Sequence, residues 1–582
     1  MIALLSTPWA LFNRPSIQLG SLKAFIKVHE PELVVKAFHF YLPIAAALGY
    51  PVYEEISQST GLSEPLYAAL LYPERFEAIE RFWRKKARRS DQLHEVSFQD
   101  LCERLEGASR RLIKSQDWAS FRLIGFSVCF SQLTSTLYFV ERIKELAPHV
   151  PIVLGGSACS GAIGKSILET FPMVDYVVSG EGELGLLSLI KETDIETRFI
   201  SGRQTGKLDR LPPPDYEDYF KALDALEPRK RFSPRIPVEM SRGCWWNKCA
   251  FCNLNLQWKG YRAKSNQKML AELVQLSNKH QILAFSFMDN LLPQKDIEPL
   301  FTGISTLGKD FELFSEIRAT TTLAGLQAMA RAGMREVQVG IEALSSTLLR
   351  KIQKGTTAID NMEIMKNCER RDTPALTGNL IMEFPGSDSS DVEETMECLN
   401  FVLPFRPLKA IPFWLGHGSP VWMNRGLFGI SKVFNHPSYR PLFPDKVLRS
   451  LVTMIQGYHG PVKEQRRLWK PVKKRIAEWS HYYQRLHQGP NTEPILCYRD
   501  GGDFLVIRER RPNGYPMTHK LKGTSRKIYL FCENKRTIQE ITARFPSFSA
   551  DQIQSFLRMM VEKRLLFHEK EKYLSLAVPA KL

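Results

Sequence analysis

Three cysteines stand close together in this chain, and they constrain it more than any other feature. Cys244, Cys249 and Cys252 are spaced C-x4-C-x2-C, directly after an extended run at 236–241. Thiolates this close form a metal site or a redox site, and a structural zinc or a fully ligated 4Fe–4S cluster needs four ligands. The next candidates along the chain are His280 and Cys368. A cluster held by three cysteines leaves one iron open to a ligand, whereas a zinc site with a distant fourth ligand is the alternative.

The aromatic residue before the last cysteine adds to this pattern, because Phe251 can pack on a cofactor bound there. The loop resembles the cluster loop of radical S-adenosylmethionine (SAM) enzymes, whose usual spacing is C-x3-C-x2-C with an aromatic residue in that place. The first gap is one residue longer here. The resemblance implies that the three cysteines are both the catalytic and the metal-binding residues.

The whole chain has the composition of an ordinary globular protein. Its 582 residues predict about three or four domains. It contains 79 basic and 62 acidic residues, and the resulting net charge of +17 favours an acidic partner: nucleic acid, anionic lipid or an acidic peptide. No apolar run approaches the length of a membrane span, and the first residues do not resemble a signal peptide. Unevenly spaced cysteines suit a reducing compartment, so we expect a cytoplasmic protein without a membrane partner.

Strands and helices alternate from residue 121 onward, and glycines follow the strands. Apolar runs at 123–128, 152–154 and 176–178 predict parallel strands of a doubly wound sheet. Glycines at the carboxyl ends of such strands let backbone amides approach a bulky, polar ligand. The candidate binding residues at this edge are Gly125, Ser127, Gly155, Gly156, Gly180, Glu181, Gly182 and Glu183.

Together with Gln132, these residues resemble the cobalamin-binding domain that precedes many radical enzymes. The Asp-x-His-x-x-Gly signature that supplies a histidine to cobalt is absent between residues 125 and 146. The resemblance therefore implies cobalamin without a histidine ligand, with Gln132, or only water and apolar groups, on its lower side. An ordinary Rossmann-like domain with glycine turns is the alternative.

Six further strands, separated by helices, predict a partial parallel barrel whose site lies at the carboxyl ends of the strands. We place the strands at 236–241, 284–289, 311–319, 336–343, 377–384 and 408–415. The candidates at or near these ends are Asp289, Glu316, Arg318, Gly340, Glu342 and Glu383. The resemblance implies that they contact SAM: Asp289 at the methionyl amine, Glu316 and Arg318 at the carboxylate, Gly340 and Glu342 at the ribose, and Glu383 near the adenine. Each of them alone fits a turn or a surface position equally well.

The C-terminal part reads as a separate unit. A hairpin at 495–508, capping boxes beginning at Thr537 and Ser549, and a second hairpin at 565–577 predict a winged-helix-like module. It resembles the modules of natural-product enzymes that pair an edge strand with a leader peptide. A tail that merely completes the core of the barrel is the alternative.

Taken together, the chain resembles the cobalamin-dependent radical SAM C-methyltransferases that mature ribosomally synthesised and modified peptides (RiPPs). The resemblance rests on residues 14–16, 180–183, 242–246, 261–265, 340–342 and 498–501. The fold class it implies is α/β and multidomain. The expected parts are a cobalamin-binding Rossmann-like domain with an N-terminal extension (1–200), a linker (201–234), a partial (βα)6 radical SAM barrel of TIM type (235–420), a helical region (421–493) and a winged-helix-like peptide-recognition module (494–582).

The implied chemistry is methylation of an unactivated carbon of a peptide, by a 5′-deoxyadenosyl radical and methylcobalamin. The cofactors are a 4Fe–4S cluster, SAM and cobalamin, and the partners are a precursor peptide and an external one-electron reductant. Two alternatives remain: a cobalamin-dependent radical SAM enzyme acting on a small molecule, lipid or RNA, and a non-catalytic cobalamin-binding regulator. The mixed charge of the expected recognition helix at 550–564 disfavours nucleic acid.

Overall fold

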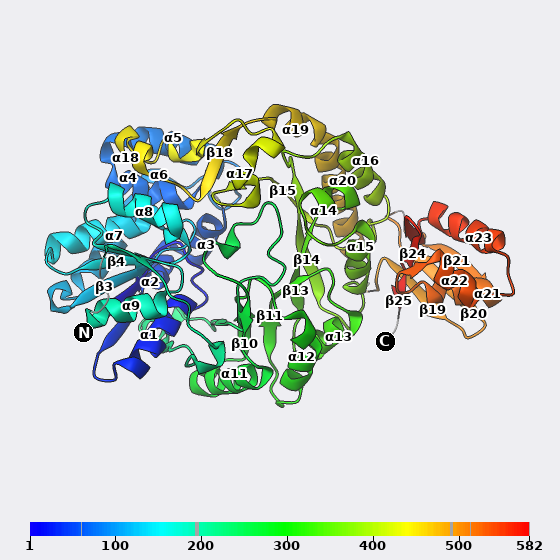
Figure 1. The fold of residues 1–582 in the computed structure, drawn as a ribbon, viewed down its shortest axis with the longest axis horizontal. Helices are drawn as coiled ribbons and strands as arrows, with labels where there is room; N and C mark the ends of the chain where they lie inside the picture. Colours follow the sequence, from blue (N-terminus) through cyan, green and yellow to red (C-terminus); the bar gives the residue numbers. More distant parts are fainter. Residues whose placement is uncertain (60, 193–196, 489–492, 513, 581–582) are drawn as a thin grey trace.

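The computed structural model describes residues 1–59, 61–192, 197–488, 493–512 and 514–580, so residues 489–492 of the expected helical region lie outside it. Three parts follow one another across Figure 1: an N-terminal sheet with its helices in blue and cyan, a central barrel in green, and a C-terminal part in orange and red. No helix within the described ranges is long and apolar enough to cross a membrane.

The N-terminal part is built on a parallel sheet of six strands in the order β2-β1-β3-β4-β5-β6. The strands are β1 (Ile2–Ser6), β2 (Val35–His39), β3 (Leu123–Ser127), β4 (Ile152–Gly155), β5 (Tyr176–Ser179) and β6 (Phe199–Ser201). β1 and β3 are buried at every position, as expected for continuous apolar runs at the centre of such a sheet. The strand order reverses between β1 and β3, which is where sheets of this kind bind ligands.

Helices cover both faces of this sheet, because alternate strand residues point to opposite sides. One face packs on α1 (Ile17–His29) and α9 (Gly182–Lys191). The opposite face packs on the helices between β2 and β3 and on those that follow β3 and β4. These helices are α2 (Tyr41–Leu48), α3 (Tyr50–Gln58), α4 (Ser63–Leu71), α5 (Phe76–Ala87), α6 (Phe98–Lys114), α7 (Leu133–Leu146) and α8 (Gly161–Thr170). The expected Rossmann-like fold is confirmed.

The central part is the expected partial barrel. Its strands are β7 (Ile236–Val238), β10 (Ala284–Phe287), β11 (Glu312–Phe314), β12 (Glu316–Arg318), β13 (Glu336–Glu342), β14 (Ala375–Met382) and β15 (Lys409–Pro412). All pair in parallel, in two sheets that meet at Ser315, where the third strand changes partner from β10 to β13. The helices between them are α11 (Asn266–His280), α12 (Ile297–Ser305), α13 (Leu323–Arg331), α14 (Ser346–Lys351), α15 (Ala358–Asn367) and α16 (Ser389–Cys398).

The region after the barrel is only partly helical, which corrects the prediction for residues 421–493. β16 (Leu415–Gly416), β18 (Ile455–His459) and β17 (Lys432–Asn435) form an antiparallel sheet before α19 (Val462–Leu468) and α20 (Lys470–His487). Each strand has at most five residues, too few for an alternating pattern that stands out in the sequence. The remaining short helices here are α17 (Pro420–Met423) and α18 (Asp445–Ser450).

The C-terminal part has a four-stranded sheet in the order β21-β20-β19-β25, three helices and a smaller sheet in the order β22-β24-β23, which forms the wing. Its elements are β19 (Leu496–Asp500), β20 (Phe504–Glu509), β21 (Met517–Lys522), α21 (Gly523–Phe531), β22 (Arg536–Thr537), α22 (Ile538–Arg544), α23 (Ala550–Glu562), β23 (Leu566–Glu569), β24 (Lys572–Ser575) and β25 (Val578–Pro579). Both capping boxes form as expected. The sequence predicted β19 and β20 but not β21, whose residues are mostly polar and exposed.

The tail is joined to the barrel by a shared core. Buried apolar residues form one continuous cluster from Ile236 in the barrel to Ala577 in the tail. Lys535 adds ion pairs of 2.7 Å to both Asp360 and Glu363 on α15. The tail therefore also takes part in the packing of the barrel, as the alternative interpretation of the sequence proposed.

Candidate functional site

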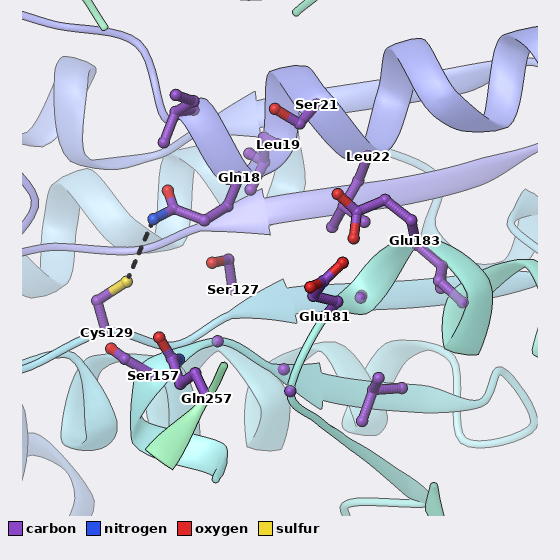
Figure 2. A pocket seen from close by; sticks show the side chains of 18 of the residues that line it. Gln18, Leu19, Ser21, Leu22, Ser127, Cys129, Ser157, Glu181, Glu183 and Gln257 are labelled. Atoms are coloured by element: carbon purple, nitrogen blue, oxygen red, sulfur yellow. Dashed lines mark hydrogen bonds between the residues drawn. The ribbon is translucent and has the colours of Figure 1, made fainter. Parts of the chain in front are cut away.

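A cavity of about 330 Å³ lies between the carboxyl edge of the N-terminal sheet and the cysteine loop, which is the segment 243–261. The sheet side is formed by the ends of β3, β4 and β5, and α1 forms a further wall (Figure 2). Leu254, Gln257 and Trp258 of the cysteine loop and Met288 and Asn290 after β10 close the other side. The residues predicted at this edge all line it: Gly125, Ser127, Gly155, Gly156, Gly180, Glu181, Gly182 and Glu183.

Gly156 is required by the backbone here. It has a φ of +98°, and a Cβ at this position would lie 2.6 Å from the carbonyl oxygen of Val128. Only glycine allows both the left-handed conformation and this close approach. The turn after β4 therefore lies flat against the segment after β3, and both line the cavity.

Gln132 does not reach the cavity, although it was predicted as a candidate binding residue. Its side-chain oxygen accepts a hydrogen bond of 2.9 Å from the backbone N–H of Cys129, and its amide nitrogen donates to the carbonyl of Thr7. The side chain is buried and both of its polar ends are used. Its role in this structure is to connect the loop after β3 to the end of β1.

The two ends of the cavity differ in polarity. At one end, Figure 2 shows Gln18, Ser127, Cys129 and Ser157. Burial raises the pKa of the Cys129 thiol, while hydrogen bonds with Ser157 and Ser127 lower it. None of the described lining residues is a histidine. The wall that a flat macrocycle would meet here is therefore formed by glycines, apolar side chains and small neutral polar groups.

Glu181 and Glu183 occupy the other end, and their carboxylates bind arginines of the barrel. Arg242 donates from Nη1 to Glu181 over 3.0 Å and from Nη2 to Glu183 over 2.6 Å, while Arg262 also binds Glu181. Although burial opposes the charge, Glu239 and Glu183 raise the pKa of Arg242 above its usual value. Burial likewise disfavours the Glu181 carboxylate, but the hydrogen bond from Arg262 and the charge of Arg242 lower its pKa.

The cysteine loop packs on the barrel mouth. Cys244, Cys249 and Cys252 are half-buried free thiols. Burial raises the pKa of Cys249 and raises that of Cys252 to about 11, while the charge of Lys354 lowers both. In the described residues, no three His, Cys, Asp or Glu side chains gather as ligands of a single metal ion. Phe251 packs against the core of the barrel beside the last cysteine.

The acidic residues at the strand ends divide into two groups. Asp289 is buried, and its carboxylate accepts hydrogen bonds from the backbone N–H groups of Met240 and Ser241 and from the Ser241 hydroxyl. Burial raises its pKa to about 7. These contacts hold the strand before the cysteine loop, so the Asp289 side chain faces the backbone of residues 240–241.

Glu316 and Glu342 lie together at the mouth with a lysine that the sequence did not reveal. Lys354 Nζ binds Glu342 Oε1 over 3.0 Å, and Glu316 accepts a hydrogen bond of 2.9 Å from Gln338. A Cβ on Gly340 would lie 2.6 Å from Lys354 Nζ, so this glycine makes room for the ammonium group. Burial, together with the charge of Glu342, raises the pKa of Glu316 to about 7.

Arg318 connects this group to the cysteine loop. Its guanidinium stacks over Trp246 at 4.6 Å and over Trp245 at 5.3 Å from the ring centres, and it donates to the carbonyl of Lys354. Glu342 and Glu383, at the ends of neighbouring strands, both have positive φ values, +65° and +62°. Such backbone strain in non-glycine residues is frequent at functional sites. Glu383 lies 3.9 Å from Arg466 of α19.

Comparison with known proteins agrees with this geometry. The profile of the Radical SAM superfamily matches residues 238–399, which begin at the last residue of β7 and include the cysteine loop and the strands from β10 to β14. These residues form a radical SAM domain. The three thiols and Lys354, which lie at the mouth of the barrel, are among the matched residues.

Curated proteins similar to this chain include two anaerobic magnesium-protoporphyrin IX monomethyl ester cyclases. The protein of Cereibacter sphaeroides is 23% identical over 275 residues, which cover 41% of this chain and 43% of the relative. The protein of Rubrivivax gelatinosus is 28% identical over 184 residues, covering 27% and 32%. The matched region is thus less than half the length of each relative.

Solved structures share the fold over most of the chain. OxsB, a cobalamin-dependent SAM radical enzyme solved with aqua-cobalamin and SAM, has a TM-score of 0.53 at 13% identity, covering 84% of this chain and 69% of its own. TsrM from Kitasatospora setae, a radical SAM methyltransferase solved with cobalamin and a [4Fe–4S] cluster, has a TM-score of 0.53 at 14% identity, covering 82% and 90%. At this identity the likeness is one of fold. It confirms the predicted combination of a Rossmann-like sheet with a radical SAM barrel.

Proposed function

We propose that this chain is a cobalamin-dependent radical SAM methyltransferase that methylates an unactivated carbon of a ribosomally synthesised peptide. One observation carries the proposal: a single cavity has the glycine-lined edge of a doubly wound sheet on one side and the cysteine loop of the radical SAM domain on the other. A cofactor on the sheet edge and a cofactor on the loop would therefore face the same space.

The fit of the cavity to cobalamin rests on its lining. Its mainly apolar wall and backbone turns suit a large, flat ligand, and the Ser127 hydroxyl adds a hydrogen-bonding group to that wall. With no histidine in the described lining, the lower face of the cobalt would meet neutral groups such as those of Gln18 and Cys129. The prediction that cobalamin binds without a histidine ligand therefore remains part of the proposal.

At the barrel mouth, Cys244, Cys249 and Cys252 would hold the cluster, with one iron left for SAM. When bound, cluster and SAM supply a radical that removes hydrogen from an unactivated carbon, and methylcobalamin supplies the methyl group. The chain's own residues provide position and exclude water. The ammonium group of Lys354 is held by Glu342 and fits over Gly340, which has no side chain. It places a positive charge beside the thiols and would attract a carboxylate such as that of SAM.

The peptide substrate is proposed from two features outside the cavity. In the described tail, β21 pairs with β20 alone, so its other edge is open to an added strand. The basic helix α19 stands at the barrel mouth, where Arg466 approaches Glu383, and its charge favours an acidic peptide. Together they would hold a precursor while one of its residues enters the site.

The proposal is tested by reconstituting the protein anaerobically with iron, sulfide, hydroxocobalamin and a reductant, and adding each short peptide encoded next to its gene. We expect 5′-deoxyadenosine and a peptide in which one hydrogen is replaced by a methyl group, with label transferred from methyl-labelled SAM. 5′-Deoxyadenosine formation and label transfer only with a small molecule, lipid or RNA would favour the alternative substrate classes. Cobalamin binding without SAM cleavage under any condition would indicate a regulator.

A further inference from the structure

The cysteine loop has a narrow neck made of two short strands. β8 (Ser241–Arg242) and β9 (Arg262–Ala263) pair antiparallel, with Arg242 directly opposite Arg262. All three cysteines lie in the segment between them, residues 243–261. Like charges facing each other across two strands repel, so this neck needs a negative partner to stay closed.

That partner comes from the N-terminal sheet. The Glu181 carboxylate, fully buried, binds Arg242 over 3.0 Å and also binds Arg262, so one side chain holds both strands of the neck. Thr205 fixes this carboxylate through hydrogen bonds from its backbone N–H at 3.0 Å and its hydroxyl at 2.9 Å. Glu183 adds the 2.6 Å ion pair to Arg242, whose side chain is 5% exposed.

The same two glutamates belong to the wall of the cavity. Residues 180–183 form the turn from β5 into α9, and this turn lines the cavity while its carboxylates reach the neck. A ligand that orders the turn therefore orders the groups that hold the cysteine loop. The guanidinium of Arg242 uses Nε for Glu239, Nη1 for Glu181 and Nη2 for Glu183, a planar arrangement that a lysine cannot reproduce.

We propose that Glu181 and Glu183 are positioning residues, which close the neck of the cysteine loop in response to occupancy of the cavity. Cobalamin binding would thereby fix the cluster loop before the radical is made. This inference rests on the proposed function, because it takes cobalamin as the ligand of the cavity. A merely structural ion network would stabilise the contact between the two domains equally with and without a ligand.

Hydrogen exchange measured by mass spectrometry separates these two roles. The cluster-reconstituted protein is compared with and without hydroxocobalamin, following peptides from residues 243–261. We expect cobalamin to slow exchange in this segment of the wild-type protein. In Glu181→Gln, exchange without cobalamin should be at least roughly tenfold faster, because a buried charge pair has been broken. Added cobalamin should bind but no longer slow the segment, and Arg242→Lys should behave in the same way.

The matched control is Glu272→Gln. Glu272 forms an equally buried ion pair of 2.6 Å with Lys264, next to the neck but entirely within the barrel. This variant should keep the slowing by cobalamin even if its melting temperature falls. If Glu181→Gln does not fold, Arg262→Gln replaces it, since Arg262 is 21% exposed and its loss opens one side of the neck.

Three results overturn the inference. The coupling is excluded if cobalamin binds the wild-type protein without slowing hydrogen exchange in residues 243–261. It is also excluded if cobalamin still slows this exchange in both neck variants, Glu181→Gln and Arg242→Lys. If both neck variants lose cobalamin binding, the ion pairs between the two glutamates and the arginines are part of the binding site and do not act as a separate positioning device. Failure of wild type to bind hydroxocobalamin is a different result, because it overturns the proposed function, and the inference with it.

Discussion

The indole of Trp246 occupies the space that a side chain at position 355 would fill. A Cβ on Gly355 would lie 2.1 Å from Cζ2 of the Trp246 ring, and Gly355 has a φ of +74°. The indole N–H donates 2.8 Å to the carbonyl of Gln353, and the guanidinium of Arg318 covers the ring. The cysteine loop is thus seated on the segment that carries Lys354, so the positions of the thiols and of this lysine depend on one close contact.

Gly355→Ala should therefore damage the cluster site. The new methyl group must displace Trp246, and alanine is strained at this φ, so we expect a loss of about 1–3 kcal/mol in unfolding free energy. Urea unfolding and iron content after reconstitution measure the two effects. Gly206→Ala is the control, because nothing lies within 4 Å of its added Cβ. Equal stability and iron content in both variants would contradict the contact described here.

Replacing Cys249 with alanine should abolish the cluster. Anaerobically reconstituted wild type should show the broad visible absorbance and the iron and sulfide content of a 4Fe–4S cluster, and Cys249→Ala should show neither. Cys398→Ala, a buried cysteine on α16, should keep the cluster. Stoichiometric zinc with no iron in anaerobically purified wild type would instead support the zinc alternative.

The sequence predicted those parts of the site that are local in the chain. The cysteine spacing and the glycines after β3, β4 and β5 are contiguous patterns, and the structure gathers the glycines at one cavity. Lys354 follows a short helix in a Lys-Gly pair with no motif, and its role depends on Glu342 across the barrel mouth. Likewise, nothing near Glu181 in the sequence points to Arg262, 81 residues away. Long-range pairs of this kind are set by tertiary packing and leave no periodic signal.

Gln132 illustrates the reverse error. The prediction placed it at the cavity because it occupies the segment where a histidine ligand is expected, but a side chain with free backbone groups beside it bonds to them first. The backbone N–H of Cys129 and the carbonyl of Thr7 take both ends of its amide. The strand β21 was missed for a different reason, since an exposed edge strand carries no apolar run.

The half-buried carboxyl of Glu316 should make stability depend on pH. Its pKa is raised to about 7 by burial and by Glu342, whereas an unfolded glutamate titrates near ~4.3. The folded state therefore binds the extra proton, so stability contributed by this group is present below about pH 4 and is lost as pH rises toward 7. Glu316→Gln should remove that loss. The change in unfolding free energy that this substitution causes should therefore be about 1–3 kcal/mol more favourable at pH 8 than at pH 4.

Urea unfolding at both pH values measures this difference. Glu336→Gln is the control, since Glu336 lies on the same strand as Glu342 but is exposed beside Arg406. A Glu316→Gln effect that is the same at pH 4 and pH 8 would show that this carboxyl titrates normally.

Bound cobalamin should carry no nitrogen ligand from the protein. Cob(II)alamin in the reconstituted protein should give an electron paramagnetic resonance spectrum without axial nitrogen hyperfine splitting, because no described lining residue is a histidine. Resolved nitrogen splitting, sensitive to ¹⁵N labelling of the protein, would refute this. Ser127→Ala is expected to weaken hydroxocobalamin binding without changing the spectrum, since it removes only a hydrogen-bonding group from the wall.

The last prediction concerns the edge of β21 and the precursor peptide. Because the barrel and tail share a core, deleting the tail would expose buried apolar surface and could not separate recognition from folding. Proline substitutions at two neighbouring residues can. Along an antiparallel strand, backbone N–H groups point alternately toward the partner strand and away from it. Of His519→Pro and Lys520→Pro, one therefore removes a hydrogen bond to β20 and the other removes only an outward donor.

We expect the inward variant to lower the melting temperature and the outward variant to leave it nearly unchanged. The outward variant should nevertheless weaken binding of a labelled precursor peptide at least roughly tenfold, since proline blocks strand addition at an edge. Cleavage of SAM without peptide should stay at the wild-type level, because the cluster and barrel are untouched. A truncated peptide that lacks its leader should be methylated equally well by the outward variant and by wild type. Unchanged precursor binding in the outward variant would show that β21 is not the recognition strand and that the tail serves the barrel alone.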